Sequence, residues 1–485
     1  MVEGGGFERI PRLKFSGKGL ILGFRTIKLN PVFLLDFQDG NVSFHKNPIK
    51  KFDYPHHVSA PPGERVAPQG KSQMIRTLSS DGNFLFITRI ARMFAYGFLS
   101  VVLMLYLEQV GLNQVQIGLL LTLTLIGDTI ISLWITTNAD RIGRRRMLIA
   151  GAFLMVFAGI LFSITRSFVF LLIAATIGVI SPSGYEVGPF LSIEQAALSQ
   201  IVANEERTKI FAWYNLVGSF ATALGALAGG SLAQALLDIG VSPLGSYRTI
   251  VIGYAIIGVM LGGLFTRLSR AVEVPIKNAL PQSISAFKNR FGLHRSRGVV
   301  LKLSALFSID AFAGGFVLQS ILAYWFHVRF NVQPAILGSI FFGANILAGI
   351  SALTAAWVAS KIGLIRTMVF THIPSNILLI LVPLMPNLPL AIVLLLMRFS
   401  ISQMDVPTRQ SYTMAVVALD ERSAAAGLTG IARTTGASLS PVFTGPLLAH
   451  AALLNVPFFL SGGLKIVYDL MLYRNFRAIK PPEEK

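Results

Sequence analysis

The chain has 485 residues, of which 53% are hydrophobic and only 13% are charged, which excludes an ordinary water-soluble domain. It contains no cysteine, which excludes disulfide frameworks, zinc–thiolate clusters and thiol nucleophiles. Its formal net charge of +19 indicates basic links beside a membrane rather than binding to nucleic acid. We therefore expect an integral membrane protein whose surroundings are the lipid bilayer, without a nucleic-acid partner.

The first 80 residues form a basic region without a sustained apolar run, and we expect most of it to be disordered. Two short apolar pieces, at residues 20–24 and 31–37, could form strands. Three interpretations stay open: a cytoplasmic tail, an organelle-targeting extension, or a start assigned too early, with Met74 as the first residue. The acidic residues in this region weigh against targeting, because transit peptides are poor in acids.

Twelve apolar stretches follow, each near the roughly 20 residues that cross the hydrocarbon of a bilayer. In chain order the expected spans are residues 84–106, 116–137, 147–164, a fourth from 168, 208–237, 247–268, 299–325, 334–358, 367–385, a tenth from 389, 423–450 and 456–472. A charged connector separates two sets of six. The expected divisions are an N-terminal region (1–80), a first half (81–269), the connector (270–297), a second half (298–474) and a tail (475–485).

The link at residues 138–146, NADRIGRRR, joins spans two and three and carries four arginines. By the positive-inside rule this link faces the cytoplasm, and twelve spans then place both chain ends on the same side. Asp140 could cap the N-terminus of a facing helix while the arginines pair across the bundle. The link would then act as a latch that closes one side of the bundle.

The two halves repeat each other. Residues 360–366 (SKIGLIR) match 140–146 (DRIGRRR) in register. Residues 195–207 (QAALSQIVANEER) match 410–422 (QSYTMAVVALDER), and at the same offset the small residues of 221–230 match those of 436–445. The sequence therefore predicts two six-helix halves in tandem.

The link and its repeat resemble the loop 2–3 signature of the major facilitator superfamily, although Thr136 and Asn138 stand where that family usually has glycine and leucine. The resemblance covers about residues 81–474. It implies an all-α membrane protein with twelve transmembrane helices in two pseudo-symmetric halves, and a secondary transporter that works by alternating access. The gating motif carried over consists of Asp140, Arg141, Gly143, Arg144, Arg145, Lys361, Gly363 and Arg366.

Span five resembles the glycine-rich antiporter motif of the family's exporter branches, with Ala226 in the place of the usual proline. Gly225 and Gly229 fit a second interpretation equally, because small residues at this spacing let helices pack closely.

Charges inside the spans are costly in hydrocarbon and mark candidate functional residues. Arg89 and Arg92 share one face of span one, where they could extend to the interface or bind an anionic substrate. Asp128 and Asp310 lie near the middle of spans two and seven. Each could make a structural polar contact or bind a proton or substrate.

Three further spans carry charges. Arg398 in span ten and Arg433 in span eleven are candidate counter-charges for these carboxylates. Lys465 and Asp469 in span twelve are four residues apart, so we expect them to pair with each other.

Spans four and ten are interrupted by proline and glycine at residues 181–189 and 403–410. Interrupted segments in corresponding positions of two halves indicate a transport site. Glu194 and Arg409 align across the repeat, and we expect them to attract when the halves close. The alternative is that both breaks are helix ends with capping acids. The candidate residues from the breaks are Glu186, Glu194, Gln195, Asp405, Arg409 and Gln410.

No phosphate-binding loop, nucleophile group or metal-binding set appears, and the histidines near span ends, His294, His327, His372 and His450, are isolated in the sequence. We therefore expect no enzyme and no cofactor. The leading hypothesis is proton-coupled efflux of a small organic solute by a monomer in the plasma membrane, with an organelle membrane as the alternative. Uptake of an organic anion, suggested by Arg89 and Arg92, and a transceptor without flux are the other hypotheses; the coupling ion could also differ.

Overall fold

The computed structural model describes residues 12–16, 19–23, 33–38 and 41–46 as strands, and then residues 79–202, 207–273, 293–418 and 421–479. The chain divides into two compact units, Met1–Lys71 and Ser72–Lys485. The connector predicted at 270–297 lies mostly outside the described residues, as does the end of the predicted tail.

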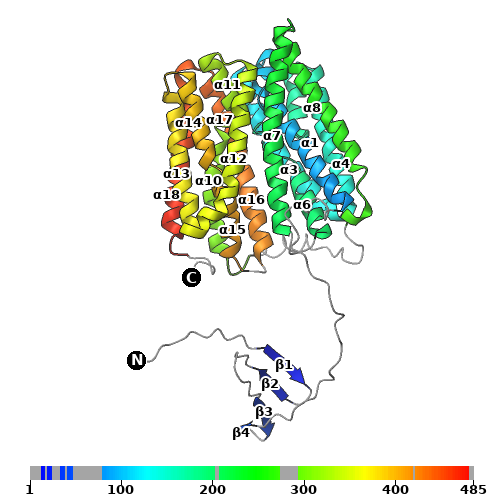
Figure 1. Cartoon of the computed structure of the whole chain (residues 1–485), viewed down its shortest axis with the longest axis vertical. Helices are drawn as coiled ribbons and strands as arrows, with labels where there is room; N and C mark the ends of the chain where they lie inside the picture. The colour runs from blue at the N-terminus through cyan, green and yellow to red at the C-terminus, as the bar shows by residue number, and fades with distance from the viewer. Residues whose placement is uncertain are drawn as a thin grey trace, which may run out of the picture. The chain divides into compact units, whose positions relative to one another are not determined.

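The first unit contains one antiparallel sheet with the strand order β1-β2-β3-β4 (Figure 1). Its strands are β1 (Arg12–Ser16), β2 (Gly19–Gly23), β3 (Phe33–Gln38) and β4 (Asn41–Lys46). The apolar pieces at 20–24 and 31–37 overlap β2 and β3. A region predicted to be mostly disordered thus contains four paired strands, and the rest of that prediction lies outside the described residues.

The second unit is helical (Figure 1). Its helices are α1 (Ser80–Ser100), α2 (Leu103–Val110), α3 (Gln114–Ile142), α4 (Arg144–Ile164), α5 (Phe168–Ile177), α6 (Phe190–Ile201), α7 (Arg207–Asp238), α8 (Pro243–Phe265), α10 (Arg297–Gly315), α11 (Gln319–Phe330), α12 (Pro334–Ile362), α13 (Leu364–Leu381), α14 (Leu388–Ile401), α15 (Asp405–Ala415), α16 (Arg422–Leu439), α17 (Pro441–Leu448) and α18 (Val456–Phe476). Short 3-10 turns are η1 (Arg270–Val272), η4 (Val382–Leu384) and η6 (Ala451–Leu453).

These helices account for the twelve predicted spans. Within the described residues, nine segments are long and apolar enough to cross a membrane, and α1 with α2, bent by 50°, makes a tenth. The other two are span four, which consists of α5 and α6 around a break, and span eleven, which consists of α16 and α17. Neither is both long and apolar in a single helix, because α5 has only ten residues and α16 is rich in threonine, serine and glycine.

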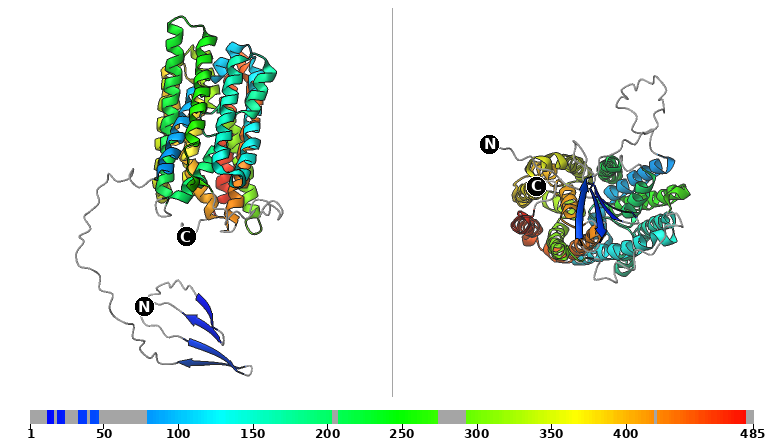
Figure 2. Two further views of the ribbon diagram at one scale, coloured as in Figure 1. Left: turned by 90° about the vertical axis from the view of Figure 1, so that its right-hand side faces the viewer. Right: turned by 90° about the horizontal axis from the view of Figure 1, so that it is seen from below.

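The two halves lie side by side, with α1–α8 coloured blue to green and α10–α18 coloured yellow-green to red (Figures 1 and 2). Helix α7 packs against α12, and α3 packs against α16 and α17. At Gly230 a Cβ atom would lie only 2.3 Å from the carbonyl oxygen of Pro334 and 2.8 Å from the Cα of Gly338. The glycines therefore let the two backbones touch, as in other tightly packed membrane helices.

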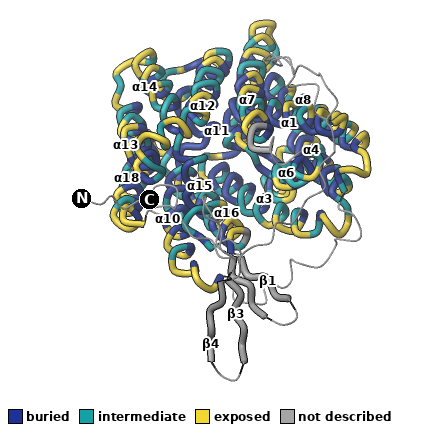
Figure 3. The backbone as a smooth tube through the Cα atoms, turned by 60° about the horizontal axis from the view of Figure 1, so that its bottom comes forward, coloured by how far each residue is buried: buried dark blue, intermediate teal, exposed yellow. Residues whose placement is uncertain are grey.

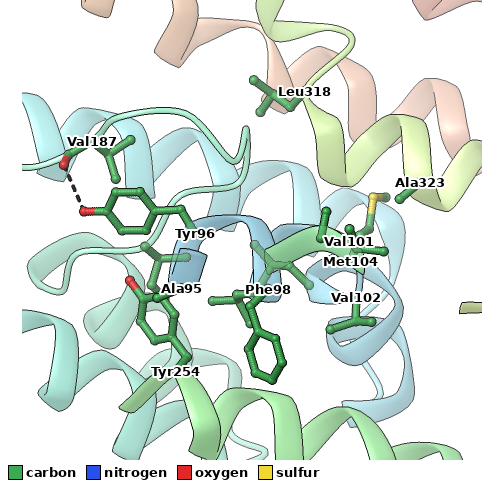
Figure 4. Close-up of a cluster of buried hydrophobic side chains, with 14 of the residues drawn as sticks. Ala95, Tyr96, Phe98, Val101, Val102, Met104, Val187, Tyr254, Leu318 and Ala323 are labelled. Atoms are coloured by element: carbon green, nitrogen blue, oxygen red, sulfur yellow. Dashed lines mark hydrogen bonds between the residues drawn. The ribbon is translucent and has the colours of Figure 1, made fainter. Parts of the chain in front are cut away.

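The outside of the bundle exposes many residues, shown in yellow in Figure 3, and many of them are apolar. Large apolar side chains such as Phe153 and Trp357 are 65% and 67% exposed on the outside, as expected where the surroundings are lipid. Inside, Tyr96 packs near Phe98 and Tyr254 (Figure 4). The Tyr96 hydroxyl donates to the carbonyl of Val187 at 3.1 Å and so ties α1 to the break in span four.

Candidate functional site

The first-half cluster consists of Arg89, Arg92, Glu186 and Glu194, all buried or nearly so. Arg92 forms a two-pronged pair with Glu194, at 2.7 Å from Nη1 to Oε1 and 2.6 Å from Nη2 to Oε2. Its Nε donates to Glu186 Oε1 at 3.0 Å, and Arg89 pairs with the other oxygen of Glu186. Such forked contacts are the strongest hydrogen bonds that an arginine makes.

Neighbouring side chains complete the cluster. Thr88 Oγ1 donates to Glu194 at 3.0 Å, and the Tyr214 hydroxyl donates to its second oxygen. The guanidinium of Arg92 lies 4.7 Å from the centre of the Phe190 ring. Arg89 and Arg92 are 5% and 0% exposed, so the prediction that they could extend to the interface is wrong.

The break in span four explains how Glu194 reaches this depth. A straight helix continued from Phe168 would carry Glu194 beyond the hydrocarbon. Instead the chain leaves α5 at Gly178 and resumes as a helix only at Phe190. After this irregular segment, Glu194 lies beside Arg92 of α1. The break in span four was therefore predicted correctly, and the alternative of a mere helix end does not describe Glu194.

Asp128 on α3 holds the same break from the other side. Its Oδ1 accepts from the backbone N–H of Gly188 at 2.7 Å and from Ser132 Oγ at 3.3 Å. Gly188 has φ +80°, a conformation that favours glycine. No cation among the described residues forms an ion pair with Asp128.

The second-half cluster is centred on Asp310 of α10 and contains Asp405, Arg409, Arg433 and Lys465. Lys465 Nζ lies 2.5 Å from Asp310 Oδ1, and Arg433 and Arg409 lie 3.3 and 3.4 Å from Oδ2. Arg409 also pairs with Asp405 at 2.5 Å. Asp310, 3% exposed, thus has three cationic partners, and Arg433 is the counter-charge that the sequence predicted.

His372 extends this cluster, although the sequence left it as an isolated histidine. Its Nδ1 lies 2.9 Å from Asp469 Oδ1, and its Nε2 lies 3.9 Å from Asp310. Asn376, one turn along α13, donates to Asp469 at 3.2 Å. The sequence pattern that could have revealed this site is a histidine and an asparagine four residues apart in an otherwise apolar span. The predicted pair of Lys465 with Asp469 is wrong, because each has its partner on another helix.

Glu194 and Arg409, which were predicted to attract when the halves close, form no ion pair with each other in this conformation. Arg92, Thr88 and Tyr214 satisfy Glu194 within the first half, and Asp405 and Asp310 hold Arg409 within the second. Gln195 and Gln410 lie on α6 and α15 and donate to neither cluster within the described residues. Arg398, the other predicted counter-charge, forms no ion pair there.

The latch residues fasten the first half rather than pairing across the bundle. Asp140 Oδ1 accepts from Arg144 Nε at 2.8 Å, and Arg144 Nη1 donates to Gln200 at 2.9 Å. Glu273, not Asp140, caps helix α4: its oxygens accept from the backbone N–H groups of Arg144 and Arg145 at 2.7 and 3.2 Å. A carboxylate at a helix N-terminus is stabilising there. We call this end of the bundle the latch end and the opposite end the far end.

The gating motif contains a glycine at the helix-to-helix turn in both halves. Gly143 has φ +115° and Gly363 has φ +87°, so each ends one helix and begins the next in a conformation that other residues rarely adopt. Lys361 and Arg366 are exposed beside Gly363, as Arg141 is in the first half.

Glu421 gives the second half a carboxylate cap of its own. It accepts from the backbone N–H groups of Arg295 at 2.7 Å and Ser296 at 2.8 Å, and from that of His294, where helix α10 begins. Burial alone would raise the pKa of Glu421, but these hydrogen bonds outweigh it and lower the pKa to about 2. The cap is therefore charged at any physiological pH.

The caps lead to a prediction that differs from the one Asp140 suggested. Glu273→Ala should lower the free energy of unfolding by about 1 kcal/mol or more, because two backbone donors lose their acceptor. Asp140→Asn should cost less than about 1 kcal/mol, since this side chain is 64% exposed and its ion pair is screened by water. Unfolding of the purified variants in detergent would compare them; a larger loss in Asp140→Asn would contradict the assignment of the cap.

The halves are hydrogen-bonded to each other at the far end. Gln319 Nε2 donates to Ser100 Oγ at 2.8 Å. The hydroxyl of Tyr324 accepts from Gln114 at 2.9 Å and donates to Glu108 at 2.9 Å. Together with a bond of 3.0 Å from the Ser320 N–H to the Pro182 carbonyl, these are four bonds between the halves. The bonds of Gln319 and Ser320 join the break of span seven to those of spans one and four.

Comparison with known proteins agrees with this architecture. The family model of the Major Facilitator Superfamily matches residues 85–483. A Saccharomyces cerevisiae relative, the uncharacterized membrane protein YJR124C, is 32% identical over 426 residues, which cover 83% of this chain and 95% of the relative.

Solved structures of transporters share the fold at low sequence identity. The nucleoside transporter NupG, as a D323A mutant, superposes with a TM-score of 0.66 at 13% identity, covering 82% of this chain and all of that one. A bacterial homolog of the lysosomal transporter Spinster, inward-facing and occupied, gives 0.64 at 15%, covering 84% and 98%. The D-xylose–proton symporter gives 0.62 at 15%, covering 81% and 97%. With the family match over most of its length and twelve spans in two halves, the chain belongs to the Major Facilitator Superfamily of secondary transporters for small solutes.

Proposed function

We propose that the protein is a proton-coupled secondary transporter that moves a small organic solute by alternating access. The observation that carries this proposal is the carboxylate of Asp128, which lies inside the bundle without a cationic partner among the described residues. Such a group can take up a proton without an ion pair having to break. Intramembrane carboxylates of this kind serve as proton relays.

Protonation of Asp128 would reach the first-half cluster through the break in span four. The ionised carboxylate only accepts hydrogen bonds, whereas in the protonated form one oxygen carries the proton and acts as a donor. Its hold on the Gly188 N–H therefore weakens when the proton arrives. Glu186, two residues earlier, pairs with Arg89 and Arg92, so the change is transmitted to α1. Coupling needs such a difference between states.

Asp310 was predicted to share this role with Asp128. Its three cationic partners favour a different one, because a proton on Asp310 would have to displace Lys465, Arg409 and Arg433. We propose that Asp310 organises the second half and that Asp128 carries the coupling proton.

The far-end hydrogen bonds support a conformation that is closed at the far end. We propose that the latch end faces the cytoplasm, because its links carry the arginines. Both chain ends would then be cytoplasmic, in a monomer of the plasma membrane.

Two directions of transport are candidates. The resemblance of span five to the exporter motif favours export in exchange for protons, although Gly225 and Gly229 also pack directly on the backbone of α1, where a Cβ would lie 2.0 and 2.2 Å from the carbonyls of Phe94 and Phe98. Uptake of an organic anion together with protons loses the support of Arg89 and Arg92, which are paired. The uptake hypothesis is instead supported by Arg398, which forms no ion pair among the described residues.

The test is Asp128→Asn in proteoliposomes with a metabolite mixture and an imposed pH gradient. We expect the variant to lose accumulation against a concentration gradient and to keep solute exchange at zero gradient, because only proton coupling is removed. Asp238→Asn at an exposed helix end is the matched control and should behave as the parent. Reversing the gradient separates export from uptake. Undiminished accumulation by Asp128→Asn would refute the proposed role.

A further inference from the structure

Arg398 is a cation inside the bundle that has no ion-pair partner among the described residues. The other five central cations each contact a carboxylate within 3.4 Å, namely Arg89, Arg92, Arg409, Arg433 and Lys465. Among the described residues Arg398 has neither an ion pair nor a hydrogen bond, and its Nε is buried without a partner. A buried charge without a partner is costly, so its presence calls for an explanation.

The position of Arg398 on α14 excludes escape to the lipid interface. It lies on the side of the helix that carries Leu395 and Phe399, which are 0% and 7% exposed, and away from Val393 and Met397, which are both 51% exposed. Its guanidinium lies 5.0 Å from the centre of the Phe399 ring. The side chain therefore points into the protein.

Arg398 also faces the boundary between the halves. Tyr185, in the break of span four of the first half, interacts electrostatically with the guanidinium, as do Asp405 and Asp310 of the second. Tyr185 keeps 40% of its surface exposed although its neighbours in the break are buried or half-buried. An unpaired cation and a partly exposed phenol thus interact across the boundary between the halves.

The charges of the two clusters, together with Asp128 and Arg398, indicate how much negative charge a bound solute should carry. Six cations stand against six carboxylates, with His372 taken as neutral. The cations are Arg89, Arg92, Arg398, Arg409, Arg433 and Lys465, and the carboxylates are Asp128, Glu186, Glu194, Asp310, Asp405 and Asp469. A proton on Asp128 leaves one positive charge in excess. One negative charge restores the balance.

We infer that Arg398 anchors the carboxylate of a small organic monoanion, with the phenol of Tyr185 beside it. The planar guanidinium offers the parallel donors that a carboxylate accepts, and its stacking on Phe399 fixes the plane of that fork. The inference rests on the proposed transport function and names its substrate class. It also gives a reason why proton and solute would bind together.

The test measures binding to the purified full-length protein in detergent. The probes are lactate, benzoate and nicotinate, each compared with its uncharged amide. The parent should bind at least one carboxylate about tenfold or more tighter than its amide. Arg398→Gln should weaken this binding by about 10- to 100-fold, and Arg398→Lys, which keeps the charge but not the fork, by less. Arg329→Gln is the control, because Arg329 also stacks on the following phenylalanine, Phe330, but at an exposed helix end.

A second measurement separates binding from structure. Without a probe, Arg398→Gln should melt no lower than the parent, since a half-buried cation without an ion-pair partner is removed. The inference is overturned if Arg398→Gln melts lower, if it binds the carboxylate as the parent does, or if no carboxylate is preferred over its amide. Proton-driven flux of only uncharged solutes would overturn the inference and leave the proposed function standing. Binding of a carboxylate at Arg398 without proton-driven flux would overturn the proposed function and leave the inference standing.

Discussion

Arg92→Met should lower the free energy of unfolding by about 3–5 kcal/mol, which is among the largest effects expected for a single substitution here. The change removes a fully buried guanidinium and leaves Glu194, also 0% exposed, without its cation. Glu186 keeps only Arg89. Unfolding of the purified protein in mixed detergent micelles, or the amount of folded protein recovered from membranes, would measure the loss.

Two further variants make this result specific. Arg92→Met with Glu194→Met should recover most of the loss, because a buried pair replaced by apolar side chains is often neutral or stabilising. Arg146→Met, at an exposed arginine of the latch end, should stay within about 0.5 kcal/mol of the parent. If Arg92→Met is as stable as the parent, the cluster does not hold α1 to the break in span four.

Asp310→Asn should have a comparable effect, again about 3–5 kcal/mol, because three cations lose the carboxylate at their centre. Adding Lys465→Met should recover part of the loss, since it removes the cation that lies nearest, at 2.5 Å. Thermal unfolding of the two variants beside the parent would show both changes.

Asp128→Asn is the matched comparison for Asp310→Asn. Both carboxylates were predicted to have the same role, but among the described residues only Asp310 has cationic partners. An asparagine at 128 can still accept from the Gly188 N–H, so its cost should stay below about 1 kcal/mol. Equal losses of stability in the two variants would contradict the distinction between a proton carrier and the centre of an ion cluster.

The fold could be predicted because its causes are local in the sequence. A span is a run of apolar residues, so all twelve spans were predicted at nearly their observed places. The break in span four was equally visible, since proline and glycine weaken a helix. The break predicted at residues 403–410 in span ten is wrong in its extent, because the chain leaves the helix only at residues 402–404 and Pro407 lies in the first turn of α15. The repeat between residues 140–146 and 360–366 then fixed the division into halves.

The ion pairs could not be predicted because they depend on which helices lie side by side. Alignment across the repeat relates Glu194 to Arg409 by position in each half, which does not mean that they touch. The spacing of Lys465 and Asp469 puts them on one face of α18, but α10 and α13 offer better partners there. Asp310 and Lys465 are 155 residues apart in the chain, and only the packed bundle brings them to 2.5 Å.

The four hydrogen bonds between the halves at the far end also set an energy scale for the conformational equilibrium. Neutral or singly charged bonds of this kind contribute about 0.5–1.5 kcal/mol each, so that end is held by a few kcal/mol. A ligand needs a preference of about 5.5 kcal/mol to turn a 1:99 population into 99:1. A solute whose binding favours the opposite conformation by that amount would therefore be enough to break these four bonds and reverse the population.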